Sequence, residues 1–323
     1  MSKKKESVRK EILRLAVFLI VFGILFFYVS NVLEDNFARS KKGKFFTGRM
    51  GSKVLILGTS HSLYGIDPEV MDENGVPDVY NLSGYAQRMP TSYWVLNNAL
   101  DYCDPEVVVV DLYSVERDDK YSVESLGFVH MTMDAIPLSK KKIQMAKDLF
   151  EDKETQKEML FSFYLYHNRW DELKPSDFEI FRYYTKGYRG LENGCVREKK
   201  CVAAETPTYI SSEKSAGVNS VGYEYLKKIC DLCDKKGIKL VLTFIPHAAG
   251  EEQQAIVNGI GKMAEERGYG FYNMLYDPEI GIDYGTDFTD KGSAHVNTTG
   301  AAKVSKALAE YLLSEGYVSS SAN

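Results

Sequence analysis

The sequence predicts an α/β protein: a three-layer α/β/α sandwich on a mainly parallel sheet, preceded by one transmembrane helix and interrupted by a mostly helical insertion. Three observations support this prediction. Short apolar runs alternate with helical stretches after residue 53, a long uncharged segment lies near the N-terminus, and a stretch rich in Lys, Tyr and Phe breaks the alternation. Strands that alternate with helices of ordinary length are typical of such a sandwich.

The uncharged segment predicts a membrane anchor. Residues 15–33 (LAVFLIVFGILFFYVSNVL) form a run of 19 without a charge, which at ~1.5 Å per residue is long enough to cross a ~30 Å hydrocarbon layer. No small-residue cleavage site follows, so we expect an uncleaved anchor rather than a signal peptide. Basic residues flank both ends of the span. Because short N-terminal flanks stay inside and long domains translocate regardless of charge, we expect residues 1–14 in the cytoplasm and the rest outside.

The soluble part is expected to hold one domain. Residues 34–52 are basic and contain glycine, which predicts a juxtamembrane linker that touches anionic lipid heads. The α/β domain is expected at 53–317 and a Ser-rich tail at 318–323. Strands are predicted from apolar, β-branched runs, and helices from periodic stretches between them. The strands are 54–57, 78–82, 106–112 and 238–244, and the helices are 90–102, 221–236, 251–267 and 298–315.

The segment from about 118 to 216 departs from this alternation. We interpret it as an insertion over the carboxyl edge of the sheet, where α/β proteins bind ligands, and so as a candidate lid or acceptor-binding surface.

Composition excludes several classes. A net charge of −5 and an isoelectric point near 5.7 argue against nucleic acid as a partner, because phosphate binding needs a basic face. Five cysteines are too few for a disulfide scaffold, although Cys195 and Cys201 bracket a loop that a disulfide would close. No spacing of Cys and His matches a zinc site, so neither a metal nor another cofactor is expected.

Two short motifs carry candidate chemistry. Gly58-Thr59-Ser60 directly follows the first predicted strand, where a serine on a Gly-assisted turn is exposed to substrate. The other motif, DFTDKGSAHVN, precedes the last helix and contains His295. A serine nucleophile needs a base, and the base needs a carboxylate to orient it. Ser60, His295 and Asp290 would fill these roles, and capping of the neighbouring helices is the alternative explanation for both motifs.

These motifs, in this order, resemble the SGNH (GDSL-like) hydrolase superfamily, and in detail its membrane-anchored, cell-surface branch. GTSHSLYGIDP is similar to the first block of that branch, NLSGYAQ to the second and DKGSAHVNTTGAAKVS to the last. YHNRW followed by DF is similar to a motif of bacterial members with this insertion. The resemblance implies a flavodoxin-like sandwich, Ser60 as nucleophile, and Ser60 and Gly84 as backbone donors of the oxyanion hole.

Two departures from the family pattern matter. Asp290 stands five residues before His295 where the pattern has three, so Asp287 is an alternative partner for the histidine. The third block, Gly-x-Asn, is absent, and Asp111 lies in that region. Since one oxyanion donor stabilises the transition state by ~2.7–4 kcal/mol, its loss predicts slow hydrolysis or an enzyme suited to transfer.

The resemblance implies a serine esterase or O-acyltransferase that acts on acetyl or similarly small acyl esters. Its acceptor would be a cell-envelope polysaccharide or a teichoic-acid-like polymer, and its partner a membrane-bound O-acyltransferase. We expect His61, His247 and Trp170 to contact substrate, with structural roles as the alternative. An inactive scaffold or polysaccharide-binding protein of an envelope acylation system is the competing function, and a cytosolic enzyme is a weaker one.

Overall fold

Five parallel strands form the central sheet of this computed structural model, which describes residues 2–48, 50–180 and 191–319. Their order in the sheet is β2-β1-β3-β6-β7. The α/β class and the four predicted strands are confirmed, whereas β7 was not predicted because its sequence, GFYN, is short and weakly apolar. The strands are β1 (Val54–Leu57), β2 (Val79–Asn81), β3 (Val107–Asp111), β6 (Lys239–Phe244) and β7 (Gly270–Asn273).

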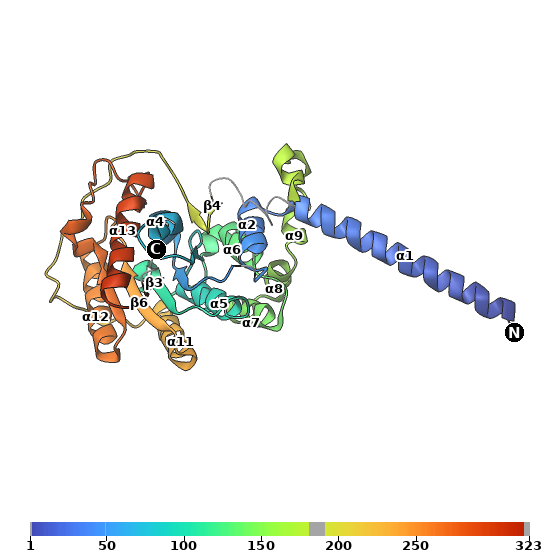
Figure 1. Cartoon of the computed structure of the whole chain (residues 1–323), viewed down its shortest axis with the longest axis horizontal. Helices are drawn as coiled ribbons and strands as arrows, with labels where there is room; N and C mark the ends of the chain where they lie inside the picture. Colours follow the sequence, from blue (N-terminus) through green and yellow to red (C-terminus); the bar gives the residue numbers. More distant parts are fainter. Residues whose placement is uncertain (1, 49, 181–190, 320–323) are drawn as a thin grey trace.

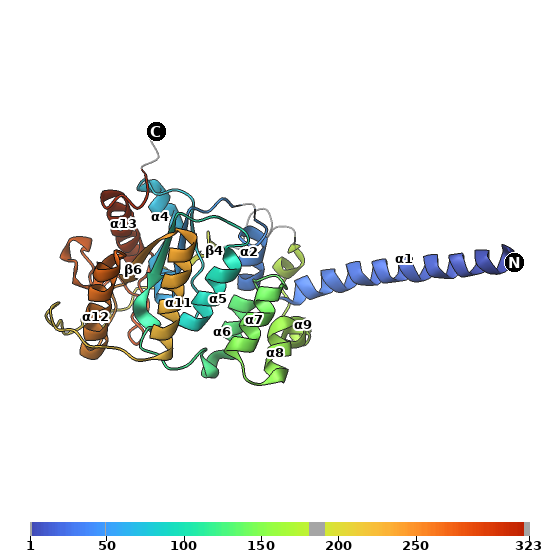
Figure 2. The same cartoon turned by 90° about the horizontal axis from the view of Figure 1, so that it is seen from below.

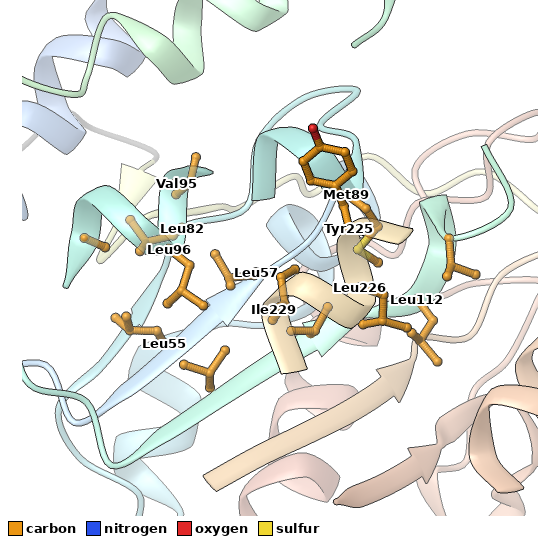
Figure 3. Close-up of a cluster of buried hydrophobic side chains, with 14 of the residues drawn as sticks. Leu55, Leu57, Leu82, Met89, Val95, Leu96, Leu112, Tyr225, Leu226 and Ile229 are labelled. Atoms are coloured by element: carbon orange, nitrogen blue, oxygen red, sulfur yellow. The ribbon is translucent and has the colours of Figure 1, made fainter. Parts of the chain in front are cut away.

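The strand sequences are continuously apolar because their side chains are buried on both faces of the sheet. Leu55 and Leu57 belong to one buried cluster, and Val54 and Ile56 to another. The first cluster includes side chains of α5 (Met89–Ala99), α11 (Val221–Lys236) and α12 (Glu251–Arg267), and the second those of α4 (Pro68–Glu73) and α13 (Thr298–Ser314). Part of the first cluster, with β1 and α11 side chains labelled, appears in Figure 3.

The helices begin and end where local chemistry predicts. Ser220 accepts a hydrogen bond from the backbone N–H of Tyr223 at the start of α11, and Asn297 caps α13. At the other ends, Gly237 after α11 and Gly268 after α12 adopt left-handed φ angles of 69° and 72°, which glycine adopts without steric cost. All four predicted helices are present.

The insertion between β3 and β6 has two unlike parts. Residues 126–178 are mostly helical, as predicted, and a two-stranded hairpin follows. Residues 197–219 have no helix or strand, and 181–190 lie outside the described residues, as does most of the predicted tail. The elements are α6 (Leu126–Met133), α7 (Lys140–Leu149), α8 (Lys153–Leu160), α9 (Phe163–Tyr166), η3 (Arg169–Asp171), η4 (Pro175–Phe178), β4 (Leu191–Glu192) and β5 (Cys195–Val196).

The segment predicted as a linker is instead a packed part of the fold. It holds α2 (Asn36–Lys44), which Asp35 caps, and Phe37, Arg39 and Lys41 are buried. The Arg39 guanidinium donates to the backbone oxygen of Asp177 at 2.7 Å and to its carboxylate at 3.2 Å. The Lys41 ammonium donates to the Ser83 carbonyl oxygen, so these two basic side chains bind the protein rather than lipid heads.

The long N-terminal helix, α1 (Ser2–Leu33), projects from the domain (Figures 1 and 2). Its last turn is held by the insertion, because Arg169 donates to the carbonyl oxygens of Leu33 and Glu34 at 2.6 and 2.9 Å. Such contacts satisfy acceptors that a helix end leaves unpaired.

Replacing Arg39 by Ala leaves the buried Asp177 carboxylate without its charged partner. We expect the free energy of unfolding to fall by ~3–5 kcal/mol, measured by chemical denaturation of the full chain in detergent. Glu106→Ala is the control, since it breaks an exposed pair with Lys53 and should cost less than ~1 kcal/mol. Equal losses in the two variants would contradict a supporting role for the buried pair.

Candidate active site

Ser60 lies at the carboxyl edge of the sheet, where β1 turns into the short helix α3 (Ser60–Gly65). Gly58 makes the turn possible: a Cβ at this position would lie 2.8 Å from the Cβ of Asp111 and 2.2 Å from the hydroxyl of Ser62. The ends of β1 and β3 can therefore approach each other only with glycine there. The turn presents the Ser60 hydroxyl to the loop before α13.

A continuous chain of hydrogen bonds joins the three predicted catalytic residues. The Ser60 hydroxyl lies 2.8 Å from His295 Nε2, and His295 Nδ1 lies 2.8 Å from a carboxylate oxygen of Asp290. Because the carboxylate accepts from Nδ1–H, Nε2 is left to accept from the serine. Structurally, this is the arrangement of a Ser-His-Asp triad.

Asp290 is held as an ionised acceptor. Its carboxylate also accepts from the backbone N–H groups of Ser293 and Ala294, at 2.7 and 3.0 Å. Partial burial raises the pKa of Asp290, but the hydrogen bonds from His295 and the backbone outweigh it and bring the pKa below its ordinary value. Ala294 has a left-handed φ of 53°, which is unusual outside glycine and turns the chain into His295.

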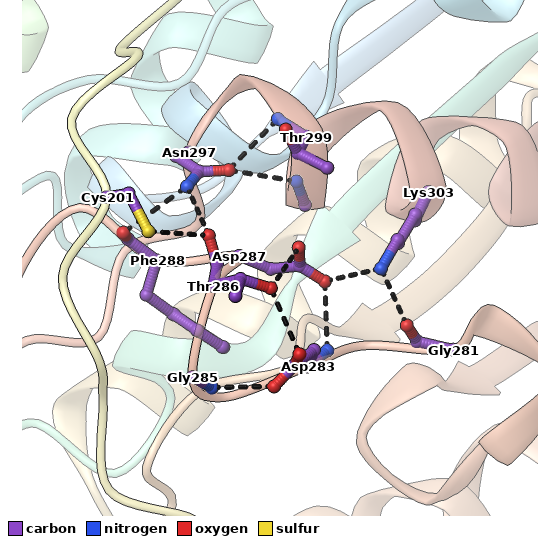
Figure 4. A network of polar contacts seen from close by, with 11 residues as sticks. Cys201, Gly281, Asp283, Gly285, Thr286, Asp287, Phe288, Asn297, Thr299 and Lys303 are labelled. Carbon is purple, nitrogen blue, oxygen red and sulfur yellow. Dashed lines mark hydrogen bonds and ion pairs between the residues drawn. The ribbon is translucent and has the colours of Figure 1, made fainter.

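Asp287, the alternative partner for the histidine, has a different contact. Its buried carboxylate binds Lys303 Nζ at 2.6 Å and accepts from the Asp283 N–H at 2.9 Å (Figure 4). It joins the loop to α13. Of the two carboxylates that the sequence leaves open, the structure gives Asp290 to His295.

The segment 197–210, which has no regular secondary structure, runs along this loop. Its Val202 N–H donates to the Phe288 carbonyl and its Ala204 N–H to the Tyr284 carbonyl, both at 2.8 Å. Cys201 lies on this segment, with its sulfur 3.2 Å from the Thr286 carbonyl oxygen. No disulfide joins it to the buried Cys195, both of which lie in the described part of the chain.

Two aromatic rings lie near the His295 ring. The His61 and Tyr64 rings lie with centroids 4.6 and 5.1 Å from it. His61 in turn stacks on Tyr113 at 3.8 Å and donates from Nε2 to the Ser293 carbonyl at 2.7 Å. Tyr64 and Tyr113 were not predicted; the sequence signal for Tyr64 is its position one helical turn after Ser60.

Two of the three predicted substrate contacts are buried side chains. His61 is only 2% exposed and His247 only 4%, and burial lowers the pKa of both rings. His247 lies against the Ile245 carbonyl and the Gln253 amide. Both histidines therefore support the site from within. Trp170 lies in η3, beside the end of α1, and none of the contacts described for the triad involves it.

Gly84 follows β2 as predicted, but its N–H is already engaged. It donates to the Gly58 carbonyl at 3.3 Å. A Cβ at this position would lie 2.5 Å from the Thr132 hydroxyl, so the glycine is also needed for packing. In this conformation Gly84 is not a free oxyanion donor, which departs from the expectation.

Asp111 occupies the end of β3 and is buried beside Gly58. Burial raises the pKa of its carboxyl to about 7, although the nearby N–H groups of Tyr113 and Ile245 reduce the effect. A neutral carboxylic acid can donate a hydrogen bond, which an ionised one cannot.

Comparisons with known proteins add no assignment. A scan against protein-family models finds no match, and a search of curated proteins finds no significant match. Within the described ranges, no group of three or more His, Cys, Asp or Glu side chains is placed to hold a metal ion. The function is therefore inferred from the geometry around Ser60.

Asp111→Asn tests the buried carboxyl. In the unfolded chain this group ionises near pH ~4, whereas in the folded protein it stays protonated up to about pH 7. The stabilisation that the protonated Asp111 carboxyl gives the folded state is therefore complete below pH ~4 and is lost as the pH rises to about 7. We expect the melting temperature of the Asn variant, relative to wild type, to rise between pH 4 and pH 8. A difference that does not change with pH would contradict the raised pKa.

Proposed function

We propose that this protein is a membrane-anchored, extracytoplasmic serine esterase or O-acyltransferase of the SGNH kind. The observation that carries the proposal is the hydrogen-bonded chain from Asp290 through His295 to Ser60, with both links at 2.8 Å. The resemblance of the three sequence blocks supports the same class. We also propose that the helices flanking the parallel sheet form the outer layers of a three-layer sandwich.

The chain of bonds supports a two-step acyl transfer. Ser60 Oγ attacks the ester carbonyl carbon while His295 Nε2 takes the hydroxyl proton, and Asp290 stabilises the imidazolium. His295 then returns the proton to the departing alkoxide as the C–O bond breaks, which leaves an acyl ester on Ser60. In the second step, water or a sugar hydroxyl loses a proton to His295 and attacks this ester. As the bond between the acyl carbon and Ser60 Oγ breaks, His295 returns that proton to Oγ and the free serine is restored.

Oxyanion stabilisation is the weak part of the site. The Ser60 N–H lies at the start of α3, where helix N–H groups lack intrahelical acceptors. Gly84 can contribute only if its 3.3 Å bond to the Gly58 carbonyl opens when substrate binds. Since one donor contributes ~2.7–4 kcal/mol, we expect slow turnover.

The membrane location is supported by α1. Its Ser7–Leu33 part is long and apolar enough to span a bilayer, and its window of highest hydropathy is not buried in the protein. We propose that the domain lies outside the membrane, where the acyl group is exchanged with a cell-envelope polysaccharide or teichoic-acid-like acceptor. A membrane-bound O-acyltransferase is the partner that the family resemblance implies.

The test compares the full chain in detergent with single variants, using a serine-directed fluorophosphonate and p-nitrophenyl acetate. Ser60→Ala should abolish labelling, and Asp290→Asn should lower esterase activity by ~10²–10⁴-fold, because the ring loses its orienting carboxylate. Asp287→Asn is the matched control: it removes a carboxylate three residues away that binds Lys303 instead, and activity should change less than tenfold.

If the fluorophosphonate labels the wild-type protein no more strongly than the Ser60→Ala variant, the esterase proposal is wrong. The protein would then be a non-catalytic scaffold or a polysaccharide-binding protein. If Asp287→Asn were the more damaging variant, the assignment of the triad acid would be wrong.

His61→Phe tests whether the buried histidine positions the base. The variant keeps an aromatic ring beside His295 but loses the N–H that holds the Ser293 carbonyl. We expect kcat for p-nitrophenyl acetate to fall by ~10–100-fold with KM nearly unchanged. His61→Gln keeps a donor and should recover part of the loss. Wild-type kcat in the Phe variant would show that the bond does not position the loop.

A further inference from the structure

A group of large apolar side chains is exposed on the insertion near the end of α1. We call it the aromatic foot. Each of its side chains is between 44% and 67% exposed, and in a protein surrounded by water such a patch marks a contact with another molecule or a membrane. The members are Phe161, Tyr164, Leu165, Trp170 and Phe178.

The foot lies directly beside α1. The Phe163 ring of α9 packs on the Phe26 ring of α1, with centroids 5.1 Å apart, and Arg169 binds the last carbonyls of α1. Figures 1 and 2 both show α9 next to the domain end of α1. The insertion therefore reaches back along the apolar helix, past the point where that helix enters the domain.

The part of α1 that is both exposed and uncharged is too short to cross a bilayer alone. It is uncharged and exposed from Leu15 to Tyr28 and becomes buried in the protein by Asn31. Those 14 residues rise ~21 Å, whereas the hydrocarbon layer is ~30 Å thick. If α1 spans a membrane, the hydrocarbon must extend to the level of residues 29–33. At that level α9 and η3 lie beside the helix.

The side chains of the foot suit this depth. Tyr and Trp prefer the boundary between hydrocarbon and headgroups, because one end of each ring is apolar and the other polar. The opposite side of α9 faces the protein: Tyr166 is buried, with its ring centroid 6.5 Å from that of His130. Asp177, just before Phe178, holds Arg39. The foot is thus presented outward by a packed support.

We propose that the aromatic foot inserts into the interfacial layer of the bilayer that α1 spans, as a second membrane contact of the domain. The inference rests on the proposed anchoring by α1 but not on the proposed esterase activity. Its occupant is lipid, because the foot lies beside α1 at the level of residues 29–33, which the hydrocarbon must reach if α1 spans the bilayer. A second copy of the chain or another membrane protein is the alternative occupant.

Tryptophan fluorescence tests the inference, because the chain has two tryptophans. Trp94 is partly buried in the core, with its indole N–H on Asp148 at 2.6 Å, and Trp170 is in the foot. The full-length Trp94→Phe variant, with Trp170 alone, is placed in phosphatidylcholine–phosphatidylglycerol nanodiscs with brominated acyl chains. We expect at least ~twofold quenching, strongest with bromine near the headgroups. The matched control Trp170→Phe, with Trp94 alone, should not be quenched.

Equal fluorescence of Trp170 in brominated and ordinary lipid would overturn the inference, whether water or another protein covers the foot. Resistance of the protein to alkaline extraction from membranes reports separately on α1. If α1 is not embedded, the foot proposal fails with the anchor. Labelling of Ser60 in the same sample reports on the esterase proposal, so the failure of either proposal is recognised independently.

Discussion

The hydrogen bond between Ser60 and His295 joins residues 235 positions apart in the sequence, and the rest of the structure is arranged so that it can form. Parallel strands bring their carboxyl ends to one edge, which fixes the serine. The histidine arrives from the loop before the last helix. Gly58 lets β1 and β3 come close enough for both groups to share that edge.

A loop loses conformational entropy when it is ordered, and several contacts in different parts of the fold offset this cost for the loop that carries His295. Lys303 holds Asp287 at its start, the segment 197–210 runs beside it, and His61 holds the Ser293 carbonyl near its end. The orientation of the His295 ring thus depends on contacts made by residues outside the chain from Asp290 to Ser60.

Local patterns in the sequence were enough to predict the main strands, the four helices and the positions of Ser60 and His295. What they could not predict depends on distant partners. Nothing near Asp287 reveals that Lys303 will bind it, so the acid of the triad stayed open. Residues 34–52 looked like a linker because the partner of Arg39 is Asp177 in the insertion. The engagement of the Gly84 N–H by Gly58 likewise appears only in three dimensions.

Only Glu34 and Asp35 separate α1 from α2. A series of ring contacts joins α2 to the candidate active site. Phe37 contacts Tyr85, whose ring neighbours Tyr64, which in turn lies against His295. The domain is therefore joined to α1 by a packed helix and not by an extended linker. With α1 in a bilayer, the packing of α2 sets the height of Ser60 above the lipid surface, and under the proposed function a polymer chain is modified along the part that passes at that height.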